Sequence, residues 1–309
     1  MAFVIKVLCV LLITTCFGLY RYSSKIETAL LFHPDTTGIL LNGWEPWEIG
    51  IADMPQSSIG YHRRMSSNSR IGILCFTGNA GNAASWAVST FGPMFNQGYV
   101  HIYEYPSFGT RNATSDPLIA EQIERQFLEE VRIGMNMHAN HWIVVGVSMG
   151  TGFATRIVRE YPELFEAVIL IVPYSSIRNV IDHFTSGLLG RFTSYDWLNN
   201  EKNLEAITEI PVYAFFGEED SLLPIGVHMK PLERVLDRFE VVEGAGHNDV
   251  MFHASVVSEI SSIVEGVEKY YGIPEYEMVS TASLDNIIRL YECYIRWGLI
   301  QKNRVIKFS

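Results

Sequence analysis

The chain is poor in cysteine and carries no excess of positive charge. Its four cysteines, Cys9, Cys16, Cys75 and Cys293, form no CxxC pair, which argues against a disulfide scaffold and against a cysteine-based zinc site. The formal net charge is -11, so the chain lacks the basic surface that nucleic-acid binding requires. It also lacks internal repeats, which excludes a repeat architecture.

Long hydrophobic runs are missing too, except at the N-terminus. Residues 2–20, AFVIKVLCVLLITTCFGLY, contain a single charge, Lys6, and are long enough to cross a bilayer. We expect an uncleaved signal anchor, since no small-residue cleavage site follows; a cleaved signal peptide and a buried helix are the alternatives. Positive charges flank the run on both sides, at Lys6 and at Arg21 and Lys25, so the sequence leaves the orientation in the membrane open.

What remains is an alternation of short apolar runs with amphipathic segments. It predicts an α/β fold, a mostly parallel central sheet flanked by helices, with enough apolar content (48% of 309 residues) for a sizeable core. A helix is expected between residues 115 and 138, capped by Ser115 or Asp116, with Pro117 at its first position. Residues 173–210 leave room for a short lid at most. The predicted strands are 71–76, 99–105, 141–147, 167–172, 211–216 and 238–244.

A serine between two glycines follows the predicted strand 141–147. In GVSMG, Gly146 to Gly150, a tight strand-to-helix turn would expose Ser148 at the carboxyl edge of the sheet, beside the first amides of the next helix. The pattern predicts that Ser148 is a nucleophile. A glycine-rich turn with a solvated serine is the alternative.

A nucleophilic serine needs a base and an acid, and both follow it in the order that this architecture imposes. His247 stands in GAGHND, after strand 238–244 and flanked by glycines, and is the predicted general base. Asp220 stands in GEEDSLLP, after strand 211–216, and is the predicted acid that orients the histidine. Glu218 and Glu219 compete with Asp220, and a solvated acidic loop is the alternative.

A tetrahedral intermediate also needs two backbone N–H donors. We expect one from Met149, directly after the nucleophile, and the other from Asn79 in TGNAGN, the loop after strand 71–76. A plain Gly-Asn turn is the alternative for Asn79.

Six motifs occur in the order found in one known group. TGNAGN, YEYPSFGTRN, GVSMGTG, VPYSSIRNV, GEEDSLLP and GAGHND resemble the membrane-anchored abhydrolase-domain group of the α/β-hydrolases, which is similar to serine aminopeptidase-like hydrolases. The resemblance covers about residues 29–270 and implies the α/β-hydrolase fold. It also implies a membrane-anchored serine hydrolase that cleaves a lipid or acyl-protein ester or thioester through an acyl-enzyme, with no metal or cofactor. The implied roles are nucleophile for Ser148, acid for Asp220, base for His247 and oxyanion donors for Asn79 and Met149.

Two positions depart from that group's pattern. Thr77 replaces the histidine that usually precedes the Gly-Asn pair, and Ser107 replaces the glycine that usually precedes the aromatic residue of YPSFGT. Both lie in loops beside the expected site, so the substrate range is the least transferable property. A catalytically silent binding or scaffolding protein, and a haloperoxidase-like chemistry on the same fold, are the alternative functions.

The resemblance divides the chain into an anchor and juxtamembrane segment (1–28), a catalytic domain (29–272) and a C-terminal helical extension (273–309). In the extension, apolar residues from Leu284 to Ile295 recur at helical spacing after Ser283, which predicts a helix. We expect this apolar face to pack on the catalytic domain; contact of the helix and its basic end with anionic lipid is the alternative. Asn112 begins the chain's N-x-S/T sequon, an acceptor site for a glycan.

Overall fold

A computed structural model describes most of the chain between residues 24 and 271. The described residues are 6, 10, 11, 14, 15, 18, 24, 25, 27–37, 41–50, 57–66, 69–111, 119–135, 139–187 and 189–271. The expected C-terminal helix, the sequon at Asn112 and the expected caps Ser115 and Asp116 lie outside them. Among these residues no helix is both long and apolar enough to cross a membrane, and most of the stretch 2–20 falls outside them.

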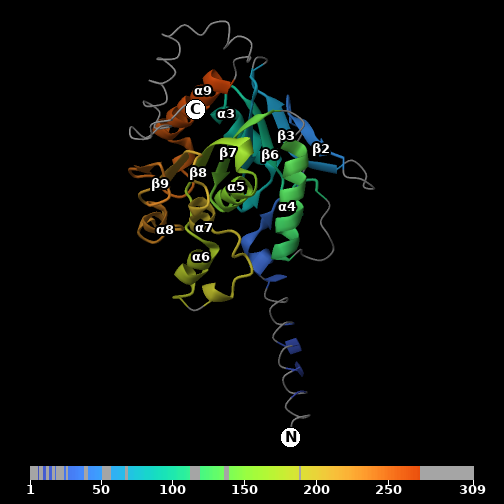
Figure 1. Ribbon diagram of the computed structural model, residues 1–309, viewed down its shortest axis with the longest axis vertical. Coiled ribbons are helices and arrows are strands. Elements are labelled where there is room, and N and C mark those ends of the chain that lie inside the picture. The colour runs from blue at the N-terminus through green and yellow to red at the C-terminus, as the bar shows by residue number, and fades with distance from the viewer. Residues whose placement is uncertain are drawn as a thin grey trace, which may run out of the picture.

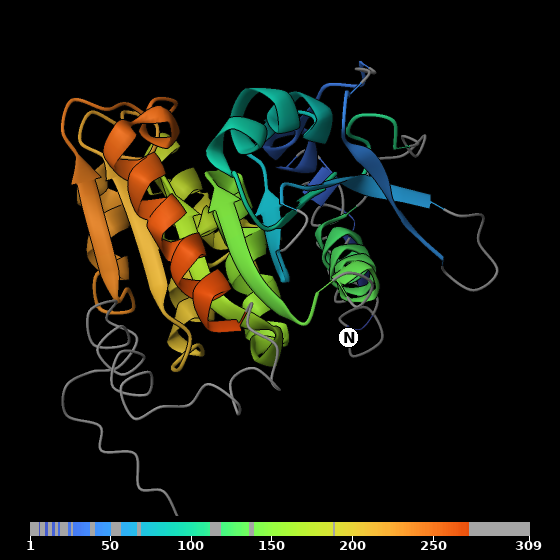
Figure 2. The same cartoon turned by 90° about the horizontal axis from the view of Figure 1, so that it is seen from above.

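A strongly twisted sheet of eight strands runs through the molecule (Figures 1 and 2). Its order is β10-β9-β8-β7-β4-β6-β3-β2, and all neighbours are parallel except β3, which is antiparallel to both β6 and β2. The predicted mostly parallel sheet is therefore confirmed, whereas β2 and β3 were not predicted. The strands are β2 Glu45–Ile49, β3 Ser57–Arg64, β4 Ile71–Phe76, β6 Tyr99–Tyr103, β7 His141–Val147, β8 Phe165–Ile171, β9 Val212–Gly217 and β10 Arg238–Val242.

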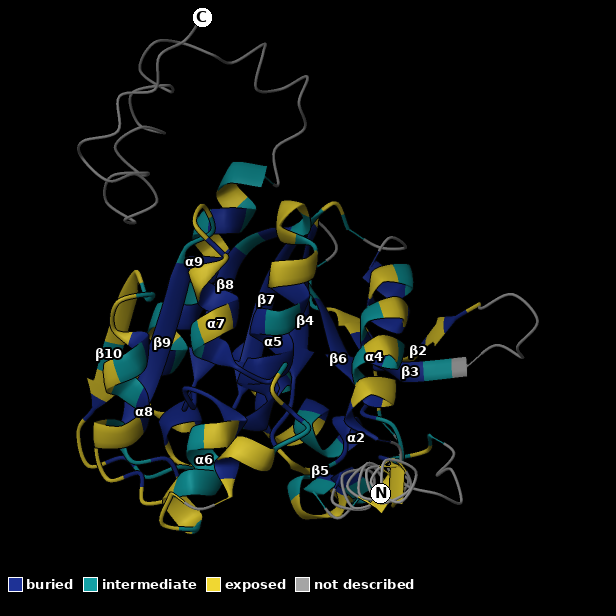
Figure 3. Cartoon of the chain, turned by 60° about the horizontal axis from the view of Figure 1, so that its bottom comes forward, coloured by how far each residue is buried: buried dark blue, intermediate teal, exposed yellow. Residues whose placement is uncertain are grey.

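The central strands are apolar on both faces because helices cover both. Along β4, Leu74 and Phe76 enter one hydrophobic cluster while Ile73 and Cys75 enter the other, as the two-residue period of a strand requires. Figure 3 shows these strands fully buried between helices whose outer surfaces are exposed. Such burial on both sides explains why β4 and β7 read as continuous apolar runs.

The helices divide between the two faces of the sheet according to these clusters. On one face lie α4 Ala120–Met135, α5 Met149–Glu160, α7 Asn200–Glu205 and α8 Ile225–Leu232. On the other lie α2 Ala83–Trp86, η1 Ala87–Phe91, α3 Gly92–Met94 and α9 Ala254–Tyr271. The segment after β8 holds α6 Ile177–Phe184 and η3 Gly190–Phe192. Two further turns are η2 Pro162–Leu164 and η4 Val250–Phe252, and a small parallel ladder joins β1 His33–Pro34 to β5 Ala80–Gly81.

The start of α4 differs from the expected one. The helix begins at Ala120, so Pro117 is not its first residue and that prediction was wrong. The Gln122 side chain accepts a hydrogen bond from the Ile119 amide at 3.1 Å, and it thereby satisfies one donor at the helix start. A glutamine three residues into the helix, and not the proline, therefore marks the boundary.

Phe153 on α5 is the centre of an aromatic cluster and is fully buried. Its ring lies within 6.4 Å of the rings of Phe32, Phe76, Tyr105, Phe127 and Trp197. This cluster joins α5 to the sheet, to α4, to the segment before the sheet and to the segment between β8 and β9.

We expect Phe153→Ala to lower the free energy of unfolding by about 3–5 kcal/mol, because a large cavity would replace the ring. Urea titration of the full chain in detergent measures this. Val88 is exposed on η1, so Val88→Ala is the matched control and should change stability by less than about 0.5 kcal/mol. Equal effects of the two substitutions would contradict the role of Phe153 in the core.

Candidate active site

Ser148 lies at a sharp turn between β7 and α5. Its backbone adopts φ 52° and ψ -117°, a conformation that residues with a side chain rarely adopt. A Cβ on Gly150 would lie 2.3 Å from the carbonyl oxygen of Phe76, and a Cβ on Gly146 would lie 2.6 Å from that of Gly150. Only glycine fits at either position, so both glycines of the motif are explained by close backbone approach.

The turn is attached to the neighbouring strand. The Ser148 amide donates to the carbonyl oxygen of Ile171, the last residue of β8, at 2.9 Å. Val172 follows with φ 45°, which is a real outlier for a β-branched residue. Backbone strain of this kind costs about 1–3 kcal/mol per residue and persists only where the surroundings enforce it. Two strained residues therefore lie side by side at the carboxyl edge of the sheet.

His247 connects the serine to an acid. Its Nε2 lies 2.9 Å from Ser148 Oγ and its Nδ1 lies 2.7 Å from Asp220 Oδ2. A carboxylate can only accept, so Nδ1 carries the proton and Nε2 is free to accept the serine hydroxyl. The expected hydrogen-bonded series of the three residues is thus present, with His247 in the loop after β10 and Asp220 in the loop after β9.

Asp220 is fixed and ionised. Its side chain is only 3% exposed, and Oδ1 accepts the amides of Leu222 and Leu223 at 2.9 and 2.7 Å. Burial raises the pKa of this carboxyl, but the hydrogen bonds from His247 and the two amides together outweigh burial, so the pKa lies below its ordinary value. The competing acids Glu218 and Glu219 are exposed, and the carboxylate hydrogen-bonded to His247 is that of Asp220, so the geometry favours Asp220 as the acid.

The expected oxyanion donors come from two elements that meet at the serine. Met149 is the first residue of α5, so its amide has no acceptor within the helix. Asn79 lies in the loop after β4, and a Cβ on the preceding Gly78 would lie 4.0 Å from Ser148 Cβ. The loop therefore passes directly beside the nucleophile, and the structure brings all five expected site residues to one place.

No protein-family model matches the chain, and no curated protein sequence does. Solved structures do match. An esterase of Pyrococcus furiosus aligns at a TM-score of 0.57 with 15% identity, over 76% of this chain and 97% of its own. A membrane phospholipase A, described as a bacterial virulence factor, aligns at a TM-score of 0.54 with 15% identity, over 87% of this chain and 99% of its own. The protein has the α/β-hydrolase fold.

The two departures from the α/β-hydrolase group's motifs have visible consequences. Thr77 is buried, and its hydroxyl donates to the Gly78 carbonyl at 3.2 Å while its own carbonyl accepts the Tyr105 hydroxyl at 2.8 Å. The threonine thus stiffens the loop without a histidine. Ser107 adopts φ 71°, the conformation that a glycine at this position would adopt without strain.

Residues before the sheet contact the loop after β4, which holds the expected oxyanion donor Asn79. The His33 amide donates to the Asn79 carbonyl at 2.8 Å, and the Asp35 amide donates to the Gly81 carbonyl at 3.1 Å. Asn82, the cap of α2, donates to the Asp35 carbonyl at 3.3 Å. None of the sequence motifs predicted these contacts.

Glu104, directly after β6, contacts the start of α2, which follows the same loop. Its Oε1 accepts the amide of Ala83, the first residue of α2, at 2.9 Å, while its buried Oε2 has no hydrogen-bond partner among the described residues. A Cβ on Gly109 would lie 2.1 Å from Oε2, so this glycine makes room for the carboxyl. Burial raises the pKa of Glu104 to about 7; the Ala83 amide and Arg111 lower it in part, and Asp35 raises it.

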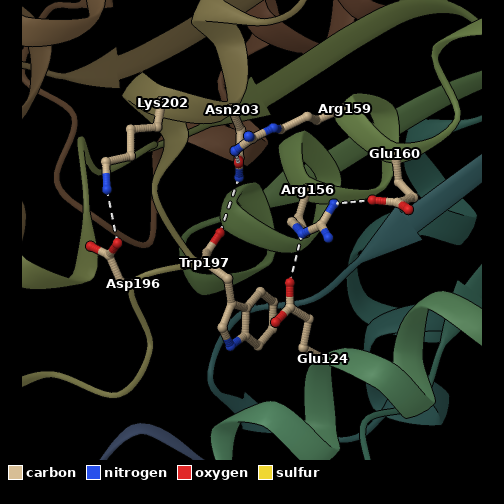
Figure 4. A pocket seen from close by; sticks show the side chains of 8 residues that line it. All are labelled: Glu124, Arg156, Arg159, Glu160, Asp196, Trp197, Lys202 and Asn203. Atoms are coloured by element: carbon tan, nitrogen blue, oxygen red, sulfur yellow. Dashed lines mark hydrogen bonds and ion pairs between the residues drawn. The ribbon is translucent and has the colours of Figure 1, made fainter.

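A polar cavity of about 410 Å³ lies along α5, away from its N-terminus (Figure 4). Arg156 is paired with Glu124 and Glu160, and Lys202 with Asp196. Arg156 is eight residues from Ser148 along the helix, which corresponds to about 12 Å. These charges satisfy one another, so the cavity is not part of the site.

We expect Glu104→Gln to change how stability depends on pH. A carboxyl whose pKa is raised in the folded state stabilises the fold below its unfolded pKa, and this contribution is lost as pH rises toward 7. Between pH 5 and 8 the wild type should therefore lose about 3 kcal/mol relative to the glutamine variant. Urea titrations of both proteins at the two pH values measure the difference, and Glu219→Gln in the exposed loop is the control. Parallel pH curves for wild type and Glu104→Gln would contradict this account.

Proposed function

We propose that the protein is a membrane-anchored serine hydrolase that cleaves a carboxylic ester or thioester. The observation that carries the proposal is the hydrogen-bonded series from Ser148 through His247 to Asp220, at 2.9 and 2.7 Å. Its position at the strained strand-to-helix turn supports the proposal, since that turn exposes the serine. A binding protein on the same fold would not need both distances to be this short.

The reaction would proceed in two steps. Ser148 Oγ attacks the substrate carbonyl while His247 Nε2 takes its proton, and Asp220 stabilises the charged imidazole. The amides of Asn79 and Met149 bind the developing oxyanion. His247 then protonates the leaving group, and a water activated by the same imidazole releases the acid.

The fold supports an ester as the substrate. Two of its structural relatives are an esterase and a membrane phospholipase A. A thioester, of lipid or of an acylated protein, uses the same steps and is the second substrate class. Neither needs a metal or a cofactor, because the imidazole and two amides supply the acid-base and electrostatic parts of the reaction.

The anchor is residues 2–20. The described residues of this stretch, Lys6, Val10, Leu11, Thr14, Thr15 and Gly18, are helical and exposed, which supports an apolar helix that leaves the domain. Two of them, Val10 and Leu11, are large apolar residues that contact with lipid would cover. The expected C-terminal helix lies outside the described residues; if its basic end contacts anionic lipid instead of packing on the domain, it would add a second membrane contact.

We expect a fluorophosphonate probe to label the wild type and to leave Ser148→Ala unlabelled. Ester hydrolysis by Ser148→Ala, His247→Ala and the double variant should fall by a similar factor, about 10⁴–10⁶, because the residues act as a unit. Asp220→Asn should lose somewhat less. Initial rates with a soluble short-chain ester measure this.

Matched controls exist for each position. Ser89 is exposed, so Ser89→Ala should label as the wild type does, and Glu218→Gln and Glu219→Gln should keep full activity. A folded wild type that is neither labelled nor active would favour the binding protein. Losses that add between Ser148→Ala and His247→Ala would contradict a shared mechanism.

We expect the full chain to stay with membranes during alkaline carbonate extraction, since an apolar helix of this length is held by the bilayer core. Deletion of residues 1–25 should release it. If the shortened protein still sediments with anionic vesicles at low salt, the further deletion of residues 283–309 tests the second contact. Release of the full chain by carbonate would contradict the anchor.

A further inference from the structure

Three large apolar side chains project from the segment after β8. Phe184, Leu189 and Phe192 are 60%, 53% and 64% exposed. We call these three residues the apolar tip. They lie at the end of α6 and around η3, and exposed apolar residues gathered in this way mark an interaction site.

The backbone that carries the apolar tip is held by its own side chains. Asp182 Oδ1 accepts the Gly190 amide at 2.8 Å, and the Asp182 carbonyl accepts the Gly187 amide at 2.8 Å. The Thr185 hydroxyl donates to the Ile181 carbonyl at 2.7 Å. An apolar medium offers no water for backbone hydrogen bonds, so backbone groups that enter it must be paired within the chain. These hydrogen bonds meet that requirement for the segment that carries the apolar tip.

The apolar tip lies next to the segment that leads from the N-terminus. Glu27 accepts the Ser194 amide at 2.9 Å and the Thr193 hydroxyl, directly after Phe192. Thr28 is hydrogen-bonded to Tyr195 at 2.6 Å. In Figure 1, α6 and the loop after it form the lower edge of the domain, at which residues 27–31 also lie. Leu30 is exposed as well.

The charge around the apolar tip fits an anionic surface. Arg191 is exposed within it, and its guanidinium lies 5.3 Å from the centre of the Phe192 ring. Arg178 at the start of α6 is exposed too. Acids also lie beside this segment: Asp182 accepts the Gly190 amide, Glu27 accepts the Ser194 amide, and Asp196 pairs with Lys202 at 2.8 Å. A cation beside exposed aromatic and aliphatic groups is the arrangement found at the level of lipid headgroups.

The last described residue, Tyr271, lies at the other edge of the sheet from the apolar tip. The Tyr271 ring stacks on His141, the first residue of β7, at 4.3 Å. The apolar tip instead follows β8, which is parallel to β7, and so belongs to the opposite, carboxyl edge. Ser148 is at that same edge.

We propose that the apolar tip inserts into the interfacial layer of an anionic lipid bilayer and that the acyl group of the substrate reaches Ser148 from that bilayer. This inference rests on the proposed function. The anchor places the domain near lipid, and the apolar tip orients its carboxyl edge toward it. The tip thereby selects substrates that reside in the membrane.

Depth in the bilayer is measured on the full chain in vesicles of phosphatidylcholine and phosphatidylserine. Phe192→Trp and the control Val88→Trp each add one tryptophan, and the parent protein supplies the background. With lipids brominated on their acyl chains, we expect the added fluorescence to be quenched strongly at position 192 and to be unchanged at position 88. Equal behaviour of the two positions overturns the proposal. Protection of position 192 from both bromolipid and aqueous iodide also overturns it, and indicates cover by the C-terminal segment or a second copy of the chain.

Kinetics separate this inference from the proposed function. The combined variant Phe184→Ser, Leu189→Ser, Phe192→Ser should hydrolyse a long-chain ester embedded in vesicles about tenfold more slowly, which corresponds to about 1.4 kcal/mol. Its rate on a soluble short-chain ester should equal that of the wild type, which also shows that it folds. Val88→Ser is the control. Unchanged rates on both esters overturn insertion of the apolar tip, whereas a wild type inactive on both overturns the hydrolase and leaves the quenching result to be judged by itself.

Discussion

The close approach of the start of α5 to the end of β4 is the constraint on which the site depends. At Gly150 the helix passes so near the carbonyl oxygens of Phe76 and Thr77 that a Cβ would lie 2.3 and 2.5 Å from them. That contact places the first amide of the helix, the serine and the loop after β4 within one small volume. In acyl-transfer enzymes one oxyanion donor is worth about 3–4 kcal/mol in transition-state stabilisation, so in the proposed mechanism a side chain that separated these elements would greatly slow the reaction.

Holding this arrangement requires support from distant parts of the chain. Glu104 reaches α2 from the end of β6, and His33 reaches Asn79 from before the sheet. The strain at Ser148 and Val172 is balanced by hydrogen bonds to neighbouring strands, to Ile171 and Phe215. The loops are therefore positioned by contacts between segments far apart in the sequence, and the catalytic geometry is a property of the whole domain.

The central fold could be predicted because buried strands leave a strong signal. The bounds of β4 and β7 agree with the predicted ones, since both strands are apolar on both faces. The predicted strand 99–105 was too long by two residues, since β6 ends at Tyr103; the next residue, Glu104, contacts α2 through its side chain. The edge strand β2 and its neighbour β3 were missed, since alternating polar residues there resemble a loop.

The candidate site also has a part that the sequence predicted and a part that it did not. Ser148, Asp220 and His247 could be found from motif and order alone, because each follows a recognisable strand. The sequence favoured Asp220 over Glu218 and Glu219 but left them as competitors, since a shift of one residue in a loop decides which carboxylate is buried. The partners of the oxyanion loop were out of reach of local patterns, because β1 pairs with β5 over more than forty residues.

The ladder between β1 and β5 fixes the end of the N-terminal segment to the domain. The length of this segment therefore limits the distance between the membrane and the domain. Twelve residues, 21–32, separate the apolar stretch from β1, and 24, 25 and 27–31 are helical, so this link spans at most about 30 Å. An anchored chain would thus keep its site within about 30 Å of the headgroups, and a substrate in the same bilayer would be met at the effective concentration that this short tether sets. Because anchoring would already raise the local concentration of the substrate, the site would not need to bind the substrate tightly. Its interactions could then stabilise the transition state more than the bound substrate.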